Sequence, residues 1–202
     1  MNEIEETLRS SAMRLPADVP AALQESLAER AASEGLLDVA YAELDSPIGP
    51  LAVASTDRGL VRLAYMPAEA MAEELAVKLS PRVIRSPQKL DEVRRELHEY
   101  FEGRRTDFDV PVDWSLSRGF SRRVLERTAQ IPYGQVGTYA KVAKEAGSPR
   151  AVRAAGNALG ANPVAIVVPC HRILRTGGTL GGYGGGPERK EFLLRLEGVL
   201  AV

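Results

Sequence analysis

The chain contains a single cysteine, Cys170, and the residue that follows it is a histidine, His171. A thiol is a poor nucleophile at its reference pKa of about 8.5, but an imidazole within reach, directly or through one water molecule, can accept its proton. The two side chains can therefore form an activated sulfur nucleophile. The dipeptide alone leaves an alternative open, a buried cysteine beside an incidental histidine.

Two features downstream could serve such a site. The glycine-rich segment GGTLGGYGGG precedes a helix predicted from Pro187 to a stop at Gly198. It contains neither GK[ST] nor a clean GxGxxG after a strand, so close approach of the backbone to a ligand is favoured over nucleotide binding. Glu197 lies in the last turn of that helix, where its charge opposes the helix dipole. This position indicates either a functional carboxylate or an ordinary surface residue.

A metal site is not predicted. A zinc site in a protein needs three or four ligands, and the chain offers one cysteine and one further histidine, His98. His98 lies among Leu97, Tyr100 and Phe101, which favours a packed or surface residue over a ligand. A single thiol also excludes an internal disulfide.

The segment that leads to the cysteine resembles a strand. Val164 to Val168 form a short apolar run rich in β-branched residues, which is typical of a buried strand, and Pro169 ends it. Cys170 and His171 are then expected at a strand end. Because successive side chains on a strand point to opposite faces, the two can cooperate only if the chain bends here.

Upstream of this run, the sequence predicts two short helices joined by a tight turn. Thr138 is expected to cap the first helix and Gly147 to end it, and Ser148 is expected to cap the second, with Pro149 in its first position. This is helix-turn-helix spacing. The second helix, 149–160, carries basic residues and many small ones, which let a helix approach a DNA groove closely. Packing of an alanine-rich helix inside the protein is the alternative.

Charge is distributed unevenly along the chain. The overall formal charge is −1, but residues 118–202 carry a net charge of +8 and residues 1–117 a net charge of −9. Such a split indicates a module that binds a polyanion beside one that does not. An ordinary solvated surface is the alternative.

The sequence of the first half of the chain, residues 1–117, predicts a small sheet with helices. Residues 1–35 read as one or two short helices that end at Gly35, and three strands joined by tight turns follow as an antiparallel sheet. Helical spacing returns in AEAMAEELAVKL and in QKLDEVRRELHEYFEG. The segment RRTDFDVPVDWSLS is aperiodic, and Trp114 within it is expected to pack. We predict an α/β (α+β) fold with a helical extension (1–38), an N-terminal α/β domain (39–115) and a mainly helical C-terminal domain (116–202).

The protein is expected to remain in the cytoplasm. No apolar run approaches the roughly 20 residues that cross a bilayer, and the start MNEIEETLRSS is acidic where a secretory signal would be basic and then apolar. No membrane association is predicted.

Several segments together resemble the O6-alkylguanine-DNA alkyltransferases, a family of DNA-repair proteins. They are IPYGQVGTYAKVA, SPRAVRAAGNALGANPVAIVVPCHRI, GGYGGG and RKEFLLRLEG. The resemblance begins at the DSPIGPL turn and covers residues 39–200, and the PCHR core with its upstream Asn-Pro is highly specific. It implies one irreversible transfer per molecule of a methyl or larger alkyl group from O6-alkylguanine in double-stranded DNA to Cys170. O4-alkylthymine is a possible further substrate of such a site, and the implied protein is a monomer without a cofactor.

The resemblance also implies roles for individual residues. His171 matches the general base, acting through water, and Glu197 matches the carboxylate that orients it, a relay with the logic of hydrolase triads. Arg153 matches the arginine that fills the gap left by an extruded nucleotide, and Tyr139 matches the tyrosine that crowds the flipped phosphate and assists protonation of guanine. Asn162 matches the hinge between the recognition helix and the active-site segment.

Further positions match surfaces that contact DNA or the flipped base. Family members bind the minor groove through the helix-turn-helix, where the small residues Ala151, Ala154 and Gly156 are expected to allow the approach. The backbone of Cys170 and Ile173 and the loop around Tyr183 and Gly184 match the walls that read the base.

Some positions depart from the family pattern. The cysteine and histidine ligands of a structural zinc, found in some members, are missing, and Ala165 and Gly184 replace a proline and a serine found in others. Two rival functions stay open on the residues alone. One is a thiol hydrolase that acquired a helix-turn-helix, and the other is a DNA-binding module without chemistry, a type that Cys170 disfavours.

Overall fold

The computed structural model describes residues 21–201. Within them, four strands form a sheet in the order β3-β2-β1-β4. The strands are β1 (Val39–Leu44), β2 (Leu51–Thr56), β3 (Gly59–Ala64) and β4 (Val83–Arg85). The predicted antiparallel meander β1-β2-β3 is present, but β4 pairs in parallel with β1, so the sheet is mixed. Three residues are too few for a period-two pattern, which is why the sequence did not indicate β4.

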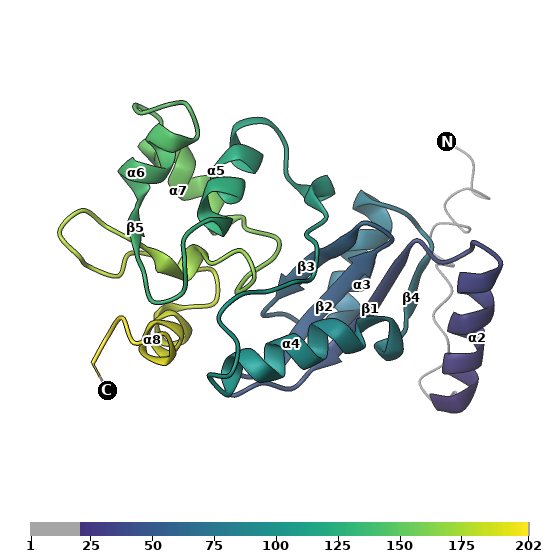
Figure 1. The fold of residues 1–202 in the computed structure, drawn as a ribbon. Coiled ribbons are helices and arrows are strands. Elements are labelled where there is room, and N and C mark those ends of the chain that lie inside the picture. Colours follow the sequence, from purple (N-terminus) through teal and green to yellow (C-terminus); the bar gives the residue numbers. More distant parts are fainter. Residues whose placement is uncertain (1–20, 202) are drawn as a thin grey trace.

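Both faces of the sheet are covered, as the alternation along β2 requires. Ala52 and Ala54 face a small cluster that contains Met71 and Leu75 of α3 (Ala68–Lys78). Leu51 and Val53 belong instead to the main core, together with α4 (Asp91–Phe101), which follows a 3₁₀ turn at Pro87–Leu90. Figure 1 shows α3 and α4 packed on the sheet. One face of the sheet therefore packs only against α3 and its neighbours, and the other face belongs to the main core that extends into the rest of the molecule.

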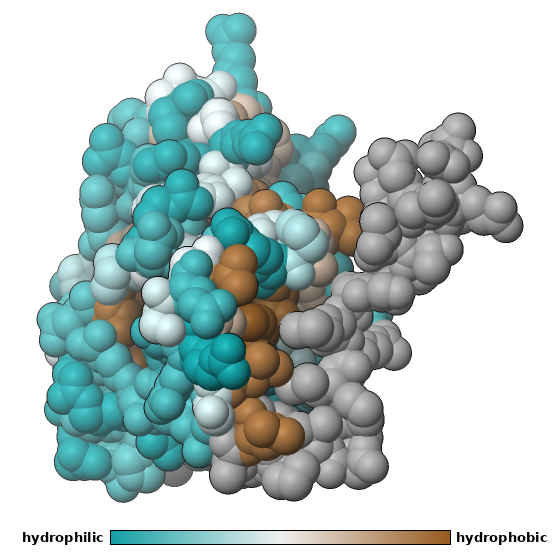
Figure 2. Space-filling model, turned by 90° about the vertical axis from the view of Figure 1, so that its right-hand side faces the viewer, coloured by the Kyte–Doolittle hydropathy of each residue, from teal (hydrophilic) through white to brown (hydrophobic). Residues whose placement is uncertain are grey.

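One helix precedes the sheet. α2 (Ala21–Ser33) buries Ala28 and Ala31 and lies beyond β4 at the outer end of the molecule (Figure 1). It confirms the predicted helix that closes at Gly35, while the part of that prediction on residues 1–20 lies outside the described residues. Figure 2 views this end, where hydrophilic residues cover most of the surface and apolar residues gather in one stretch.

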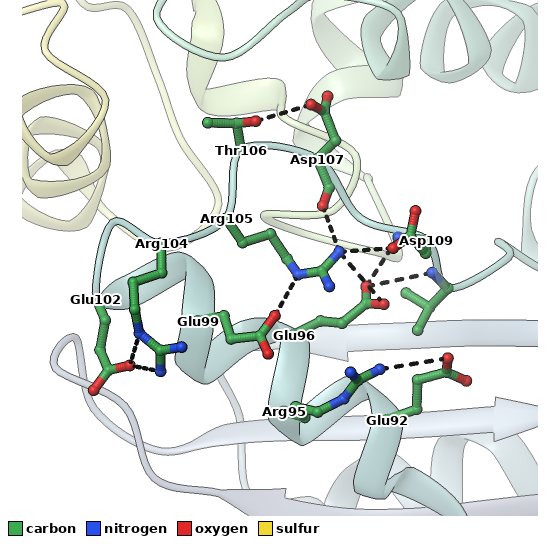
Figure 3. A network of polar contacts seen from close by, with 11 residues as sticks. Glu92, Arg95, Glu96, Glu99, Glu102, Arg104, Arg105, Thr106, Asp107 and Asp109 are labelled. Atoms are coloured by element: carbon green, nitrogen blue, oxygen red, sulfur yellow. Dashed lines mark hydrogen bonds and ion pairs between the residues drawn. The ribbon is translucent and has the colours of Figure 1, made fainter.

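A network of charged groups fixes the segment that leaves α4. Arg105 Nε donates to Glu99 at 2.8 Å and its Nη1 to Asp109 at 2.9 Å, while the buried Glu96 accepts from the backbone N–H of Asp109 at 3.0 Å (Figure 3). Farther along, Asp113 accepts from the side chain of Thr56 at 2.6 Å. The aperiodic segment is thus tied to the sheet and to α4 before the chain enters its second half.

The second half is mainly helical, as predicted. Its elements are α5 (Gly119–Ala129), β5 (Gly137–Thr138), α6 (Tyr139–Glu145), α7 (Val152–Gly160), a 3₁₀ turn (Cys170–Arg172), β6 (Ile173–Leu174) and α8 (Pro187–Leu196). Thr138 caps α6, since its hydroxyl accepts from Lys141 N at 3.2 Å. The helix-turn-helix prediction is confirmed with one correction. α7 begins at Val152 rather than at Pro149, because Ser148 to Ala151 close a turn in which Ala151 N donates to Ser148 O at 2.9 Å.

The two halves share one core and a backbone contact. Buried residues of β1, β2, β3 and α4 belong to the same cluster as those of α5, α6, α7 and α8. At the open edge of the sheet, Leu63 N donates to Pro163 O at 2.9 Å and Leu63 O accepts from Ala165 N at 3.1 Å. The edge strand β3 therefore holds the segment that leads to Cys170. Among the described residues, no helix is long and apolar enough to cross a bilayer.

Candidate active site

The segment before Cys170 is a buried series of turns and not the strand that its residues predicted. Val168 N donates to Val164 O at 2.9 Å, Cys170 N donates to Val168 O at 2.8 Å, and only Val164 bridges to the sheet. Ile166 has a φ of 70° and is the one non-glycine residue in the left-handed region among those described. Such a conformation costs a β-branched residue of the order of 1–3 kcal/mol. The packed surroundings hold the chain in this path and bend it sharply at Cys170.

The side chain of Asn162 organises these turns. Its Oδ1 accepts from Val164 N at 3.1 Å, and its Nδ2 donates to Val168 O at 2.8 Å and to Cys170 Sγ at 3.1 Å. An asparagine that bonds to nearby backbone offers the chain an alternative to a sheet ladder. It replaces the expected strand and places an N–H donor on the sulfur.

Cys170 lines a cavity of about 200 Å³ and is 7% exposed. Burial raises the pKa of its thiol above the usual value, because a thiolate loses solvation there, while the Asn162 hydrogen bond and the charge of Lys190 act in the opposite direction. The resting sulfur is therefore a protonated thiol, and it needs a base to become a nucleophile.

His171 is fully buried and belongs to a polar cluster around Glu197. The Glu197 carboxylate meets four donor contacts from three side chains. Its Oε1 is 2.7 Å from Tyr100 Oη, 2.8 Å from His171 Nε2 and 2.9 Å from Arg172 Nη2, and its Oε2 is 2.8 Å from Arg172 Nε. Arg172 and the carboxylate thus form a two-point ion pair with almost no exposure to solvent.

The electrostatics of this cluster fix the state of the imidazole. Burial alone would raise the pKa of Glu197, but the hydrogen bonds from His171 and Arg172 hold it at about 2, so the carboxylate is ionised. An ionised carboxylate only accepts hydrogen bonds, so His171 Nε2 must carry a hydrogen. Burial lowers the pKa of His171 below 6.5 despite the neighbouring carboxylate, and the imidazole is neutral at pH 7. Its Nδ1 is buried and has no hydrogen-bond partner within residues 21–201. This nitrogen is therefore a free proton acceptor.

The walls of the cavity come from both halves of the chain. The second half supplies Asn162, Ala165, Tyr183, Gly184 and Gly185, and the first half supplies the end of β3 with the residues after it, 63–66. Of the residues expected to read a base, Tyr183 and Gly184 line the cavity. Ile173, the other residue expected there, is fully buried and is not one of the lining residues. Its carbonyl oxygen accepts a hydrogen bond from Lys190 Nζ at 2.6 Å.

The predicted DNA-contacting residues lie on the helix-turn-helix. Arg153 and Ala154 are exposed on α7, and Ala151 is half-buried at its N-terminal end. Tyr139, the first residue of α6, lies across the half-buried Gly156, where an added Cβ would be 3.8 Å from the ring. The Tyr139 hydroxyl is 3.5 Å from Gly182 O, so Tyr139 touches both α7 and the glycine-rich loop.

Three residues of the polar cluster and its surroundings were not indicated by the sequence. Tyr100 reaches Glu197 from α4, 97 positions away in the chain, and Lys190 is a fully buried cation whose pKa burial lowers to about 8. Arg172 follows His171 directly, and this positive charge next to a predicted base was the one signal that could have indicated its role. His98 is exposed and pairs with Glu102, the residue that follows α4, as the packed or surface interpretation allows. Within the described residues no three metal-ligating side chains lie together.

Comparisons with known proteins agree on one family. Two family profiles match consecutive parts of the chain. The ribonuclease-like domain of 6-O-methylguanine DNA methyltransferase matches residues 39–114, and its DNA-binding domain matches residues 119–199. A methylated-DNA–protein-cysteine methyltransferase of Methanosarcina acetivorans is 38% identical over 78% of this chain and 97% of its own length. An inducible one of Bacillus subtilis is 42% identical over 72% of this chain and 82% of its own length.

Solved structures resemble the fold as well as the sequence. The crystal structure of the O6-methylguanine methyltransferase of Mycobacterium tuberculosis is 39% identical, with a TM-score of 0.66 over 79% of this chain and 92% of that one. The structure of OGT from the same organism in complex with DNA gives a TM-score of 0.67 at 39% identity, over 78% of this chain and 92% of that one. The α+β prediction is confirmed. With these matches beside a single buried thiol, a free imidazole nitrogen and a helix-turn-helix, the chain belongs to the 6-O-methylguanine DNA methyltransferase family.

Proposed function

We propose that this protein repairs DNA by moving the methyl or other alkyl group of O6-alkylguanine onto Cys170, once per molecule. The observation that carries the proposal is the lone thiol in the lining of a cavity, beside a histidine that burial keeps neutral and that Glu197 orients through a hydrogen bond. Relatives that share about two-fifths of their residues with this chain are named for the same transfer.

The reaction balances without a cofactor. The thiol proton leaves toward His171, and the sulfur attacks the alkyl carbon while the bond between that carbon and O6 breaks. The electron pair of the broken bond stays with the purine, which takes up a proton and leaves as guanine. The product on the protein is a thioether, which has no easy leaving reaction, so the sulfur is consumed. The alkyl donor is the damaged base itself.

His171, Glu197 and Asn162 prepare the sulfur. Nδ1 of His171 accepts the thiol proton, directly or through a water molecule, and Glu197 stabilises the imidazolium that forms. Asn162 donates to the sulfur at 3.1 Å, which favours the thiolate over the thiol. Tyr100 and Arg172 act on the sulfur only through the carboxylate that they hold.

The helix-turn-helix delivers the base to the cavity. An O6 substituent is shielded inside the stacked duplex, so the nucleotide must be extruded at a cost of about a few kcal/mol, least for a mispaired base. We propose that α7 enters the minor groove with its small residues Ala151, Ala154 and Gly156 against DNA, and that Arg153 fills the gap. Tyr139 would press on the flipped phosphate and help to protonate guanine.

The base would then lie between Tyr183 and Gly184 and the backbone of Cys170. Ile173 would contribute through its carbonyl oxygen, which already accepts a hydrogen bond from Lys190 Nζ. This oxygen would then accept from both the lysine and the base. We also propose that the protein acts as a cytoplasmic monomer without an obligate protein partner, and that residues 39–115 and 116–202 are its two domains with 1–38 as an extension. O4-alkylthymine is a second candidate substrate for the same chemistry.

A titration with methylated duplex separates this function from its two rivals. With duplex in excess, demethylation should stop at one guanine per protein molecule, whereas a thiol hydrolase would continue to release product. Cys170→Ala should retain affinity for the duplex and lose all transfer. If the wild-type protein binds the duplex and leaves its methyl group in place, the chain is a DNA-binding module and the proposal is wrong.

A further inference from the structure

Two tyrosines from different halves of the chain meet over the cavity. Tyr65, directly after β3, and Tyr183, in the glycine-rich loop, have their hydroxyl oxygens 2.7 Å apart, and their rings meet edge to face with centroids 5.9 Å apart. Burial raises the pKa of both hydroxyls, Tyr183 well above its ordinary value, so both stay protonated at neutral pH and one can donate to the other. This is a hydrogen bond between the sheet and the loop.

Tyr65 is itself held in place from the opposite side. The guanidinium of Arg189 lies over its ring at 4.8 Å from the centroid. Arg189 Nε donates to Ile48 O at 2.8 Å and Nη1 to Gly185 O at 2.9 Å. The tyrosine therefore belongs to a connected layer formed by the sheet, the turn before β2 and the first turn of α8.

The glycine-rich loop around Gly185 packs closely against this layer. A Cβ added to Gly185 would lie 2.5 Å from the ring of Tyr65 and 2.9 Å from that of Tyr183, so no larger residue fits there without a shift. Both rings, Gly185 and Cys170 line the same cavity. The lining of the cavity that holds Cys170 thus includes a side chain of the first half as well as the loop.

We infer that Tyr65 is a specificity-determining residue of this protein, because its hydrogen bond to Tyr183 holds the 182–186 loop down and limits the size of the alkyl group that reaches Cys170. The inference rests on the proposed function. Ala165 lines the same cavity and adds only a methyl group, so Tyr65 and Tyr183 are the largest side chains of the lining and set its free space. A branched or aromatic alkyl group would need the loop to lift.

The test compares two substrates in one duplex sequence, one with O6-methylguanine and one with O6-benzylguanine. Single-turnover transfer rates give the benzyl-to-methyl ratio for each variant. Tyr65→Phe keeps the ring and removes the hydrogen bond, and it should raise the ratio about fivefold, the factor that one net hydrogen bond supplies. Tyr65→Ala, which also opens the wall, should raise it further. Thermal unfolding of each variant shows that it is folded at the assay temperature.

A double-mutant cycle and a matched control complete the experiment. Tyr183→Phe should raise the ratio by a similar factor, and the double variant should add nothing more, since both changes remove the same bond. Tyr41→Phe, on β1 and outside the cavity, should leave the ratio at its wild-type value. An unchanged ratio in Tyr65→Phe and Tyr65→Ala, with wild-type methyl transfer intact, would overturn the inference alone. Absence of methyl transfer in the wild-type protein would instead overturn the proposed function.

Discussion

A buried imidazole can act as a base at neutral pH only if it is unprotonated before the reaction and stabilised after it. His171 satisfies the first condition because burial lowers its pKa, and the second because the ionised Glu197 lies 2.8 Å from its Nε2. Glu197 in turn is kept ionised by the hydrogen bonds that it accepts from His171 and Arg172. The misplaced charge at the end of the last helix is therefore explained by its partners, which offset its repulsion from the helix dipole.

The depressed pKa of His171 predicts the pH dependence of transfer. At pH values below the pKa of Lys190, about 8, the single-turnover rate should change little down to about 6.5, the reference pKa of histidine. It should fall at lower pH, as the imidazolium forms and can no longer accept a proton. Rates measured across this range with methylated duplex at saturating concentration provide the test. A decline whose midpoint lies above the reference value would contradict the assignment of a neutral, buried base.

For single residues, the sequence indicated which side chains belong to the site, but it did not indicate which side chains they contact. Cys170, His171 and Glu197 could be singled out from residue type, adjacency and an unfavourable position on a helix. Tyr100 could not, because its contact with Glu197 joins residues 97 positions apart, and such a contact depends on how α4 packs against the second half. The bond from Asn162 to the sulfur was hidden for a related reason, since it exists only after the chain has turned.

Among the elements, local signals predicted well where local interactions decide the structure. Thr138 caps α6 and Gly147 follows it in the left-handed region, as their residue types indicated. The run 164–168 was predicted wrongly as a strand, because β-branched composition cannot reveal that Asn162 bonds to two backbone groups within the run. The three-residue strand β4 was missed because its pairing with β1 is set by the rest of the sheet.

The helix-turn-helix predicts an effect that separates base extrusion from chemistry. Arg153→Ala should slow transfer from methylated duplex by roughly tenfold or more, since the cost of unstacking of about a few kcal/mol is no longer offset, while transfer from free O6-methylguanine stays unchanged. Arg122→Ala is the matched control, an exposed arginine on α5 paired with Glu126. Equal losses in the duplex and free-base assays would show that Arg153 acts on the active site rather than on DNA.

Helix α4 predicts a contribution of the first half to the active site. Tyr100→Phe removes a buried hydrogen bond to an ionised carboxylate, so the free energy of unfolding should fall by about 1.5–3 kcal/mol, and methyl transfer should slow as Glu197 loses a fixed partner. Urea unfolding and single-turnover rates measure the two effects. Tyr133→Phe is the comparison, because its hydroxyl donates to the neutral carbonyl of Leu196 at 2.8 Å. A smaller fall in the free energy of unfolding and in the transfer rate for Tyr100→Phe than for Tyr133→Phe would contradict the proposed role of Tyr100 in holding Glu197.

At the scale of the whole molecule, charge divides the chain and the core joins it. The basic second half and the acidic first half indicated a module that binds a polyanion beside one that does not. In the structure, buried residues of both halves belong to one cluster, and the edge strand β3 bonds to the segment before Cys170. The division into residues 39–115 and 116–202 stays a prediction about domains, and it does not require that either part be stable alone.

The shared core predicts that both parts unfold together. Trp114 is the single tryptophan of the chain and packs against the common core near the junction, so its fluorescence reports on the contact between the halves. In urea, the fluorescence transition should coincide with loss of helical circular dichroism, as for a two-state protein. Two separated transitions would show that the halves are independent and that their contact contributes little to stability.

The mass of the cysteine peptide after reaction shows directly whether the alkyl group reaches Cys170. Incubation with duplex DNA that contains O6-methylguanine should add about 14 Da, one methyl group, to the peptide that contains Cys170, with one equivalent per protein molecule and no reversal. Unmethylated duplex should leave the mass unchanged. Disappearance of the methyl group from DNA without this gain on Cys170, or an unmodified protein that demethylates many guanines, would contradict a single irreversible transfer to Cys170.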